Sequence, residues 1–352
     1  MELVLPIILF IAGLLLLIKG GDWFVDGATG LARRFKLPEI LIGATVVSIG
    51  TTLPEVMVSA GGALAESGAM AYGNAIGSII CNTALIAAIT IAIKPGRADR
   101  GAMIIPVSFF FIAAAFYVIV AYTLGTFPLW SGIVLLCLFV TYMVLTVLRM
   151  KKGGTEPFEP ELHEDEAEEA LDNGEPLPFW QEVWAELRGK RTSVVREILL
   201  LVVGAAVIAL GANLLVENGT FIAETLGVPE TVIALTFVAL GTSLPELVTA
   251  ITSLIKGHGA LSLGNIIGAN LFNLVLVSGV SITISPFDVP VDATIGGMNA
   301  SFVLDIPVML GVMLIMTVPT LIRGKLSRVQ GIALLAIYAA FVGMQFVIPF
   351  IA

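Results

Sequence analysis

The sequence predicts an all-α integral membrane protein of ten transmembrane helices, arranged as two inverted five-helix repeats. Three observations lead to this fold class. Of the 352 residues, 57% are hydrophobic and only 13% are charged, whereas soluble domains carry about 25% charged residues. Apolar runs of membrane-spanning length follow one another, without the alternation typical of membrane β-strands. A long segment of the first half also recurs in the second half.

The apolar runs divide the chain into spans separated by polar loops. We expect spans at 3–25, 39–64, 70–93, 102–123, 128–149, 194–216, 230–255, 260–284, 301–322 and 329–350. They form an N-terminal five-helix repeat at 1–150, an acidic linker with a short interfacial helix at 151–193, and a C-terminal inverted five-helix repeat at 194–352. We expect the helices of spans two, three, seven and eight to be broken.

Basic residues predict how the protein is oriented. Seventeen of the 18 Lys and Arg residues fall on one side of this topology, and the exception, Lys19, can reach the same side. Because cytoplasmic loops are rich in Lys and Arg, we expect a multi-pass protein of the plasma or inner membrane with both termini outside. The acidic stretch 156–175 would then be a solvated cytoplasmic linker. Trp180 and Trp184 indicate a short helix after it, which lies at the membrane surface or packs against the bundle.

The repeated segment carries the functional signal. Residues 37–86 and 228–277 align without a gap at an offset of 191, with 18 identities in 50 pairs. Five spans separate equivalent positions, and since five is odd, the two halves have opposite orientations. Such inverted repeats are typical of secondary transporters, whose sites lie near the bilayer midplane where the repeats meet.

Each repeat places one glutamate in the middle of a span. Glu55 ends the sequence GTTLPE in the second span, and Glu246 ends GTSLPE in the seventh. An ionised glutamate costs several kcal/mol at this depth, so a symmetric pair implies a compensating cation or protons. A protonated glutamate bonded to a neighbouring helix is the structural alternative, and it suits a single residue better than a pair.

Hydroxyl residues precede the first glutamate at helical spacing. Thr51 and Thr52 lie four and three residues before Glu55, and Ser48 lies seven before it, so all of them face one way. Pro54 has no amide N–H and therefore frees the carbonyl of Gly50. Carboxylate, hydroxyl and carbonyl oxygens together suit hard cations such as Ca²⁺ and Na⁺.

The third and eighth spans add side-chain amides. Asn74, Ser78 and Asn82 recur every four residues along one helix face. In the second repeat the equivalent positions are Asn265, Ala269 and Asn273. Buried amides usually link helices. Beside two glutamates we interpret Asn82 and Asn273 as cation ligands, and Asn74 and Asn265 as structural residues.

The paired G-T-[ST]-x-P-E motifs, each followed by G-N-x-x-G, resemble the α-repeats of the cation/Ca²⁺ exchanger superfamily, above all its prokaryotic Na⁺/Ca²⁺ antiporters. The resemblance implies that Ca²⁺ and Na⁺ bind Glu55 and Glu246 in turn, by alternating access in which spans one and six move past the core. It further implies hydroxyl or carbonyl ligands at Thr51, Thr52, Thr242 and Ser243, backbone carbonyl ligands at Ser48 and Ala239, and side-chain ligands at Ser78, Asn82 and Asn273.

Two positions depart from the family pattern. Ala269 stands where a serine is common, and Asn273 stands where many members have an aspartate. With two carboxylates, one Ca²⁺ or two Na⁺ neutralise the site, and a third Na⁺ leaves a net charge in a low-dielectric environment. The usual three-to-one exchange is therefore expected from the resemblance and is not supported by the charge count.

Three other functions compete with this hypothesis. A Ca²⁺/H⁺ exchanger would use the same two glutamates, although proton-coupled branches usually carry an acidic G-N-x-x-E motif. A cation channel is less compatible, because channels usually build their pore from identical subunits. An enzyme is not expected, since no histidine or metal cluster lies within a span. We expect a monomer whose partners are the lipid bilayer and the transported Ca²⁺ and Na⁺, and which binds no nucleic acid.

Overall fold

The computed structural model describes residues 3–35, 37–151, 194–225, 241–291 and 294–351. In the first half, α1 spans Val4–Arg34, and the second span consists of α2 (Glu39–Ile42), a π-helical turn η1 (Gly43–Val47) and α3 (Ser48–Leu64). The third span consists of α4 (Gly68–Cys81), the π-helical turn η2 (Asn82–Ala87) and α5 (Ala88–Ile93), and it is followed by α6 (Arg100–Leu124) and α7 (Leu129–Lys151).

The second half repeats this order. It begins with α10 (Val194–Thr225), and α13 (Leu244–Ile255) is the described part of the seventh span. The eighth span consists of α14 (Gly259–Phe272), the π-helical turn η4 (Asn273–Val277) and α15 (Ser278–Ile284). The π-helical turn η5 (Ser301–Asp305) leads into α16 (Ile306–Arg323), and α17 spans Arg328–Ile351.

The predicted helical membrane fold is confirmed. Among the described residues, nine helices are long and apolar enough to cross a membrane, and α13 belongs to the remaining span. The breaks expected in spans two, three and eight take the form of π-helical turns, which keep the helix continuous. In the seventh span, the turn residues Thr242 and Ser243 precede α13. The acidic linker, its expected interfacial helix and Ala239 lie outside the described residues.

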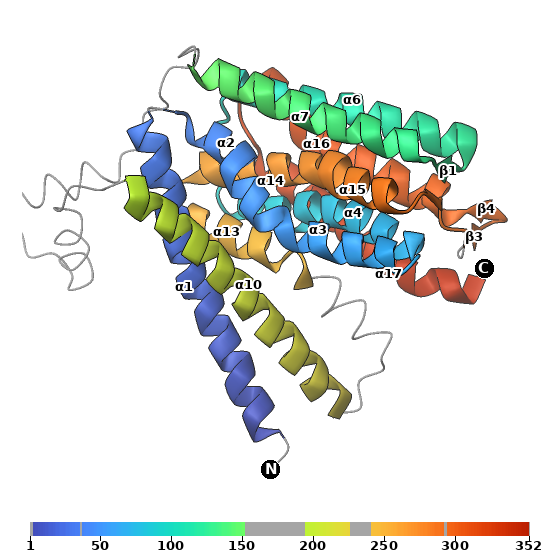
Figure 1. Ribbon diagram of the computed structural model, residues 1–352, viewed down its shortest axis with the longest axis horizontal. Coiled ribbons are helices and arrows are strands. Elements are labelled where there is room, and N and C mark those ends of the chain that lie inside the picture. Colours follow the sequence, from blue (N-terminus) through green and yellow to red (C-terminus); the bar gives the residue numbers. More distant parts are fainter. Residues whose placement is uncertain (1–2, 36, 152–193, 226–240, 292–293, 352) are drawn as a thin grey trace, which may run out of the picture.

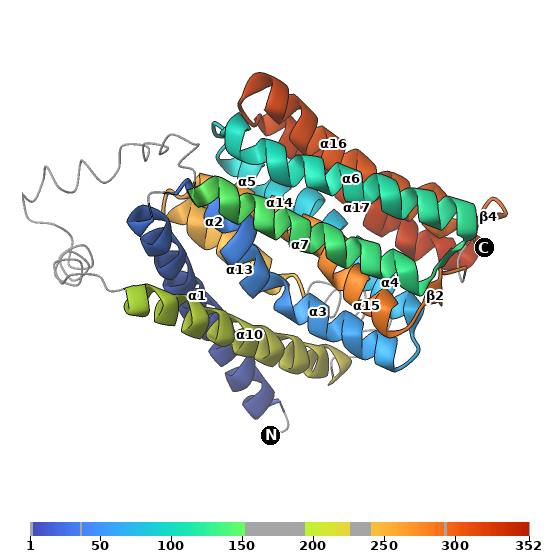
Figure 2. The ribbon, with the colours of Figure 1, turned by 45° about the horizontal axis from the view of Figure 1, so that its top comes forward.

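Helices α1 and α10 lie side by side and stand apart from the other helices along much of their length (Figures 1 and 2). Glycines bring their backbones together: a Cβ atom on Gly13 would lie 2.8 Å from the carbonyl oxygen of Gly211, and one on Gly204 would lie 2.6 Å from the amide of Phe24. Such close approach is characteristic of small residues at membrane helix interfaces. Both helices run further than predicted, and α1 does so because its contact with α10 continues past Gly27 to Gly30, which lies against Glu197.

The remaining helices form a bundle around α14, which contacts α2, α3, α6 and α13. Two loop contacts support the alternating topology of the spans. Strand β1 (Thr126–Phe127), between α6 and α7, pairs antiparallel with β2 (Phe287–Asp288), which follows α15. At the opposite end, Arg97 pairs with Lys325. A further hairpin of β3 (Thr294–Ile295) and β4 (Met298–Asn299) precedes η5.

Candidate cation site

The two repeat glutamates lie together in the interior. Glu55 on α3 and Glu246 on α13 are each 0% exposed, and these two helices contact each other. None of their four carboxylate oxygens has a hydrogen-bond partner within the described part of the chain. A buried carboxylate is costly unless it is paired, so this pair suits a positive charge placed between the helices.

Hydroxyl groups from both repeats surround this pair. Thr51 and Thr52, one turn before Glu55 on α3, lie beside the carboxylate of Glu246. The hydroxyls of Thr52 and Ser243 are buried and make no hydrogen bond to a described residue. Thr242 is partly exposed and donates to Oδ1 of Asn74 over 3.4 Å. The structure therefore brings together oxygen donors of α3 and of the start of α13.

The amides of Asn82 and Asn273 occupy equivalent places in the two repeats. Each residue is the first of a π-helical turn, is 0% exposed, and has no hydrogen-bond partner for either amide atom among the described residues. A π-helical turn leaves the regular hydrogen-bond ladder, which is why such turns are frequent at functional sites. Both amides thus remain available to a ligand.

Other predicted residues make contacts within the protein. The hydroxyl of Ser48 donates to the carbonyl oxygens of Gly43, over 2.7 Å, and of Asn265, over 2.9 Å. Nδ2 of Asn74 donates to the carbonyl oxygen of Glu55 over 3.1 Å. Oδ1 of Asn265 accepts from the hydroxyl of Thr51 over 3.2 Å. The side chains of Asn74 and Asn265 therefore link helices, which agrees with their interpretation as structural residues. Ser78 is buried, with 4% of its surface exposed.

Three buried polar residues on α13 and α14 were not among the predicted ligands. Thr249 and Ser253 follow Glu246 on the same face of α13, and both hydroxyls are buried without a described partner. Asn270 donates to the hydroxyl of Thr83 over 2.7 Å, and its own amide oxygen has no described partner. The spacing of three and seven residues after Glu246 was a usable signal, because it repeats the spacing found before Glu55.

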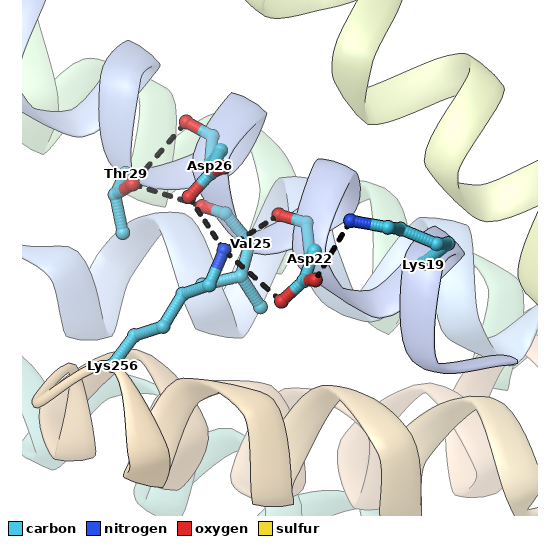
Figure 3. Close-up of polar contacts among 6 residues, drawn as sticks. All are labelled: Lys19, Asp22, Val25, Asp26, Thr29 and Lys256. Atoms are coloured by element: carbon cyan, nitrogen blue, oxygen red, sulfur yellow. Dashed lines mark hydrogen bonds and ion pairs between the residues drawn. The ribbon is translucent and has the colours of Figure 1, made fainter. Parts of the chain in front are cut away.

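One ion-pair cluster joins α1 to the helix that carries Glu246. Lys256, which follows α13, places its Nζ 2.8 Å from Oδ1 of Asp26 and 3.3 Å from Oδ1 of Asp22 (Figure 3). The same Nζ donates to the backbone carbonyl of Asp22 over 3.1 Å. The equivalent position in the first repeat is Ala65, so this connection exists in one half only.

Known proteins resemble this chain over most of its length. The chain matches the family described as sodium/calcium exchanger protein over residues 5–148 and 196–347. A membrane protein of Methanocaldococcus jannaschii is 33% identical over 346 residues, 96% of each chain. The sodium/calcium exchanger MaX1 of Methanosarcina acetivorans is 28% identical, over 97% of this chain and 98% of that protein. The solved sodium-calcium exchanger NCX_Mj, soaked with Na⁺ and Sr²⁺, superposes with a TM-score of 0.75 at 30% identity, over 97% of this chain and 98% of that one.

Proposed function

This chain belongs to the sodium/calcium exchanger family, and from that premise we propose that it exchanges Ca²⁺ for Na⁺ across the membrane by alternating access. Its relatives are exchangers, so the chain is a cation transporter of the membrane and not an enzyme. The observation that carries the finer proposal is the pair Glu55 and Glu246, which are buried on the contacting helices α3 and α13 and whose four carboxylate oxygens have no hydrogen-bond partner among the described residues.

The proposed ligand set follows the oxygens around this pair. The carboxylates bind both ions, and the hydroxyls and amides complete the shells. The set consists of Glu55, Glu246, Thr51, Thr52, Thr242, Ser243, Ser48, Ala239, Ser78, Asn82 and Asn273. Ca²⁺ takes six to eight oxygen ligands, and this set supplies hard donors from both repeats. Hydroxyl groups coordinate Na⁺ but do not take up a proton, so their presence favours Na⁺ over H⁺ as the coupling ion.

Charge sets the expected exchange ratio. Two carboxylates are neutralised by one Ca²⁺ or by two Na⁺, and Asn273 supplies no third charge. An extra Na⁺ would be a net charge in a buried site and would cost several kcal/mol. We therefore propose that any third Na⁺ is bound more weakly than the first two.

The architecture supports a moving part and a fixed part. Helices α1 and α10 pack mainly on each other and reach the core mostly through α13 and α2 (Figure 2). We propose that this pair slides past the core and opens the site to one side at a time, as is usual for inverted-repeat transporters. The repeats would be 1–150 and 194–352, with both termini outside, the linker 151–193 in the cytoplasm, and a monomer of the plasma or inner membrane as the working unit.

The test is ⁴⁵Ca²⁺ flux into vesicles that contain the purified protein. With an outward Na⁺ gradient and no pH gradient, we expect Ca²⁺ uptake that stops when Na⁺ is replaced by choline. Uptake driven by a pH gradient without Na⁺ would instead establish a Ca²⁺/H⁺ exchanger that uses the same glutamates. Downhill Ca²⁺ flux with no counter-ion would establish a channel. Either result overturns Na⁺ coupling and leaves the two-glutamate site to be tested by substitution.

A further inference from the structure

A cavity of about 100 Å³ lies away from the glutamates, at the basic end of the bundle where α13 ends and α14 begins. Its walls come from both repeats: Thr90, Lys94 and Arg97 from the first, and Gly259, Ala260 and Ser262 from the second. None of the proposed cation ligands that the structure describes lines it. The volume exceeds that of one water molecule, so a small polyatomic ion fits.

The charges around this cavity are positive. Lys94 and Arg97 line it, and none of the described residues that line it is acidic. The nearest carboxylate along the chain, that of Asp99, lines a smaller neighbouring cavity with Arg97 and accepts from the amide of Ala102 over 3.2 Å. The N-terminus of α14 adds the partial positive charge of the helix dipole.

Residues that line the cavity also carry hydrogen-bond donors. The first amides of α14, those of Gly259 and Ala260, have no carbonyl partner inside the helix, and the side chain of His258 does not cap them. Ser262, in the first turn of α14, is 3% exposed, and its hydroxyl has no hydrogen-bond partner among the described residues. A buried hydroxyl without a partner is costly, so this one indicates a ligand that accepts a hydrogen bond.

The wall that carries the basic residues is fixed before any ligand binds. The amide of Ala98 donates to the carbonyl oxygen of Gly324 over 3.0 Å, and the amide of Leu326 donates to that of Gly96 over 2.9 Å. These bonds hold the loop between α5 and α6 against the loop between α16 and α17. Lys94 and Arg97 are thus attached to an ordered wall, which lowers the entropic cost of binding.

We propose that this cavity binds a phosphate group, supplied either as inorganic phosphate or as the headgroup of an anionic lipid. Helix N-termini with nearby Lys and Arg are the usual protein site for phosphate oxygens, and basic pockets between membrane helices bind lipid headgroups. The bound group joins the first repeat to the second at the Lys- and Arg-rich end of the bundle, so it stabilises the packing of the two halves.

The experiment measures the melting temperature (Tm) of the purified full-length protein. In neutral detergent, inorganic phosphate is titrated against chloride at equal ionic strength, and we expect a saturable rise in Tm of about 2 °C or more. In a second arm, vesicles of phosphatidylcholine are compared with vesicles that also contain phosphatidylglycerol. The variant Lys94→Gln/Arg97→Gln should lose the rise, and the control Arg323→Gln, which removes an exposed charge outside the cavity, should keep it.

The outcomes separate the sources of the phosphate group. A rise in detergent that the double variant loses indicates free phosphate, and a rise confined to vesicles with phosphatidylglycerol indicates a lipid. If neither probe distinguishes the double variant from Arg323→Gln, the proposal is wrong. Should the double variant fail to fold, Ser262→Ala replaces it, with an expected loss of apparent affinity of about tenfold. Unchanged affinity in Ser262→Ala would then overturn the proposal.

Discussion

Glu55 and Glu246 are equivalent in sequence, yet the helices that carry them differ. Glu55 lies inside α3, one turn after Thr51 and Thr52, within a helix that is continuous from Ser48. Glu246 lies in the first turn of α13, which begins at Leu244. A carboxylate in the first turn of a helix is stabilised by the helix dipole, by about 0.3–1 kcal/mol at exposed positions and more when buried. The two carboxylates therefore have equivalent places in the repeated motif, but the helix dipole stabilises the negative charge of Glu246 more than that of Glu55.

The largest expected effect is one that the two glutamates share. We predict that Glu55→Gln and Glu246→Gln, each alone, reduce Na⁺-dependent ⁴⁵Ca²⁺ uptake by at least about 100-fold, since removing one partner of a buried charge interaction costs about 3–5 kcal/mol. The protein should still insert, because glutamine keeps the shape of the side chain. Glu66→Gln, in an exposed loop, is the matched control and should transport normally. Transport retained in either glutamate variant would remove that residue from the site.

The second effect distinguishes the two glutamates. In the absence of Na⁺ and Ca²⁺, and at a pH high enough to ionise both carboxyl groups, each substitution should raise the Tm of the purified protein, because it removes a buried charge. The rise should be greater for Glu55→Gln, by the equivalent of about 1 kcal/mol, because Glu246 already has the support of the helix dipole. Thermal unfolding of both variants in the same detergent measures the difference. An equal rise, or a greater one for Glu246→Gln, would contradict the comparison.

A third prediction adds charge to one repeat at a time. Asn273→Asp gives the site a third carboxylate, so a third Na⁺ no longer leaves a net charge, and we expect a change in the Na⁺ to Ca²⁺ ratio or in the voltage dependence of exchange. Reconstituted protein with an imposed membrane potential gives both quantities. Asn82→Asp is the matched change in the other repeat. If neither quantity changes for Asn273→Asp, that side chain is not in the coordination shell.

The smallest expected effect concerns the ion pairs between Lys256 and α1, which have no equivalent in the first repeat. Lys256→Gln removes the ion pairs with Asp22 and Asp26, which are partly exposed, so we expect a loss of about 1 kcal/mol or less in stability. Lys19→Gln is the control, since Lys19 is 61% exposed and lies 3.9 Å from Asp22. Hydrogen exchange of α1 should increase in the first variant and stay unchanged in the second. Equal exchange in both would show that Lys256 does not hold α1.

The sequence predicted features that depend on composition and repetition. The ten spans, the inverted halves and the fold follow from apolar run length and from the 191-residue offset, and the structure bears them out. The burial of Glu55 and Glu246 followed from their depth in the spans. The assignment of ligands remains a prediction, because nothing observed so far tests which oxygens bind an ion.

Features that depend on exact helix geometry were not predictable in the same way. The π-helical turns at Asn82 and Asn273 depend on hydrogen bonds shifted by one residue, and no residue type specifies that shift. The connection from Lys256 to Asp22 and Asp26 joins residues more than 200 positions apart, and it has no counterpart in the first repeat. The close backbone contacts that glycines allow between α1 and α10 became clear only in the folded chain.

The π-helical turns have a consequence for how such a site can be gained or lost. A π-helical turn bonds each residue to the fifth one along, so it contains one residue more than an α-helical turn. Deleting a single residue such as Ala84 from η2 would let the π-helical turn relax to an α-helical turn, which changes the backbone bonds at Asn82 while the flanking helices keep their facing. The cation site therefore depends on chain length as well as on side-chain chemistry. A one-residue deletion in these turns should therefore impair ion binding while the protein still folds, even where every ligand residue is retained.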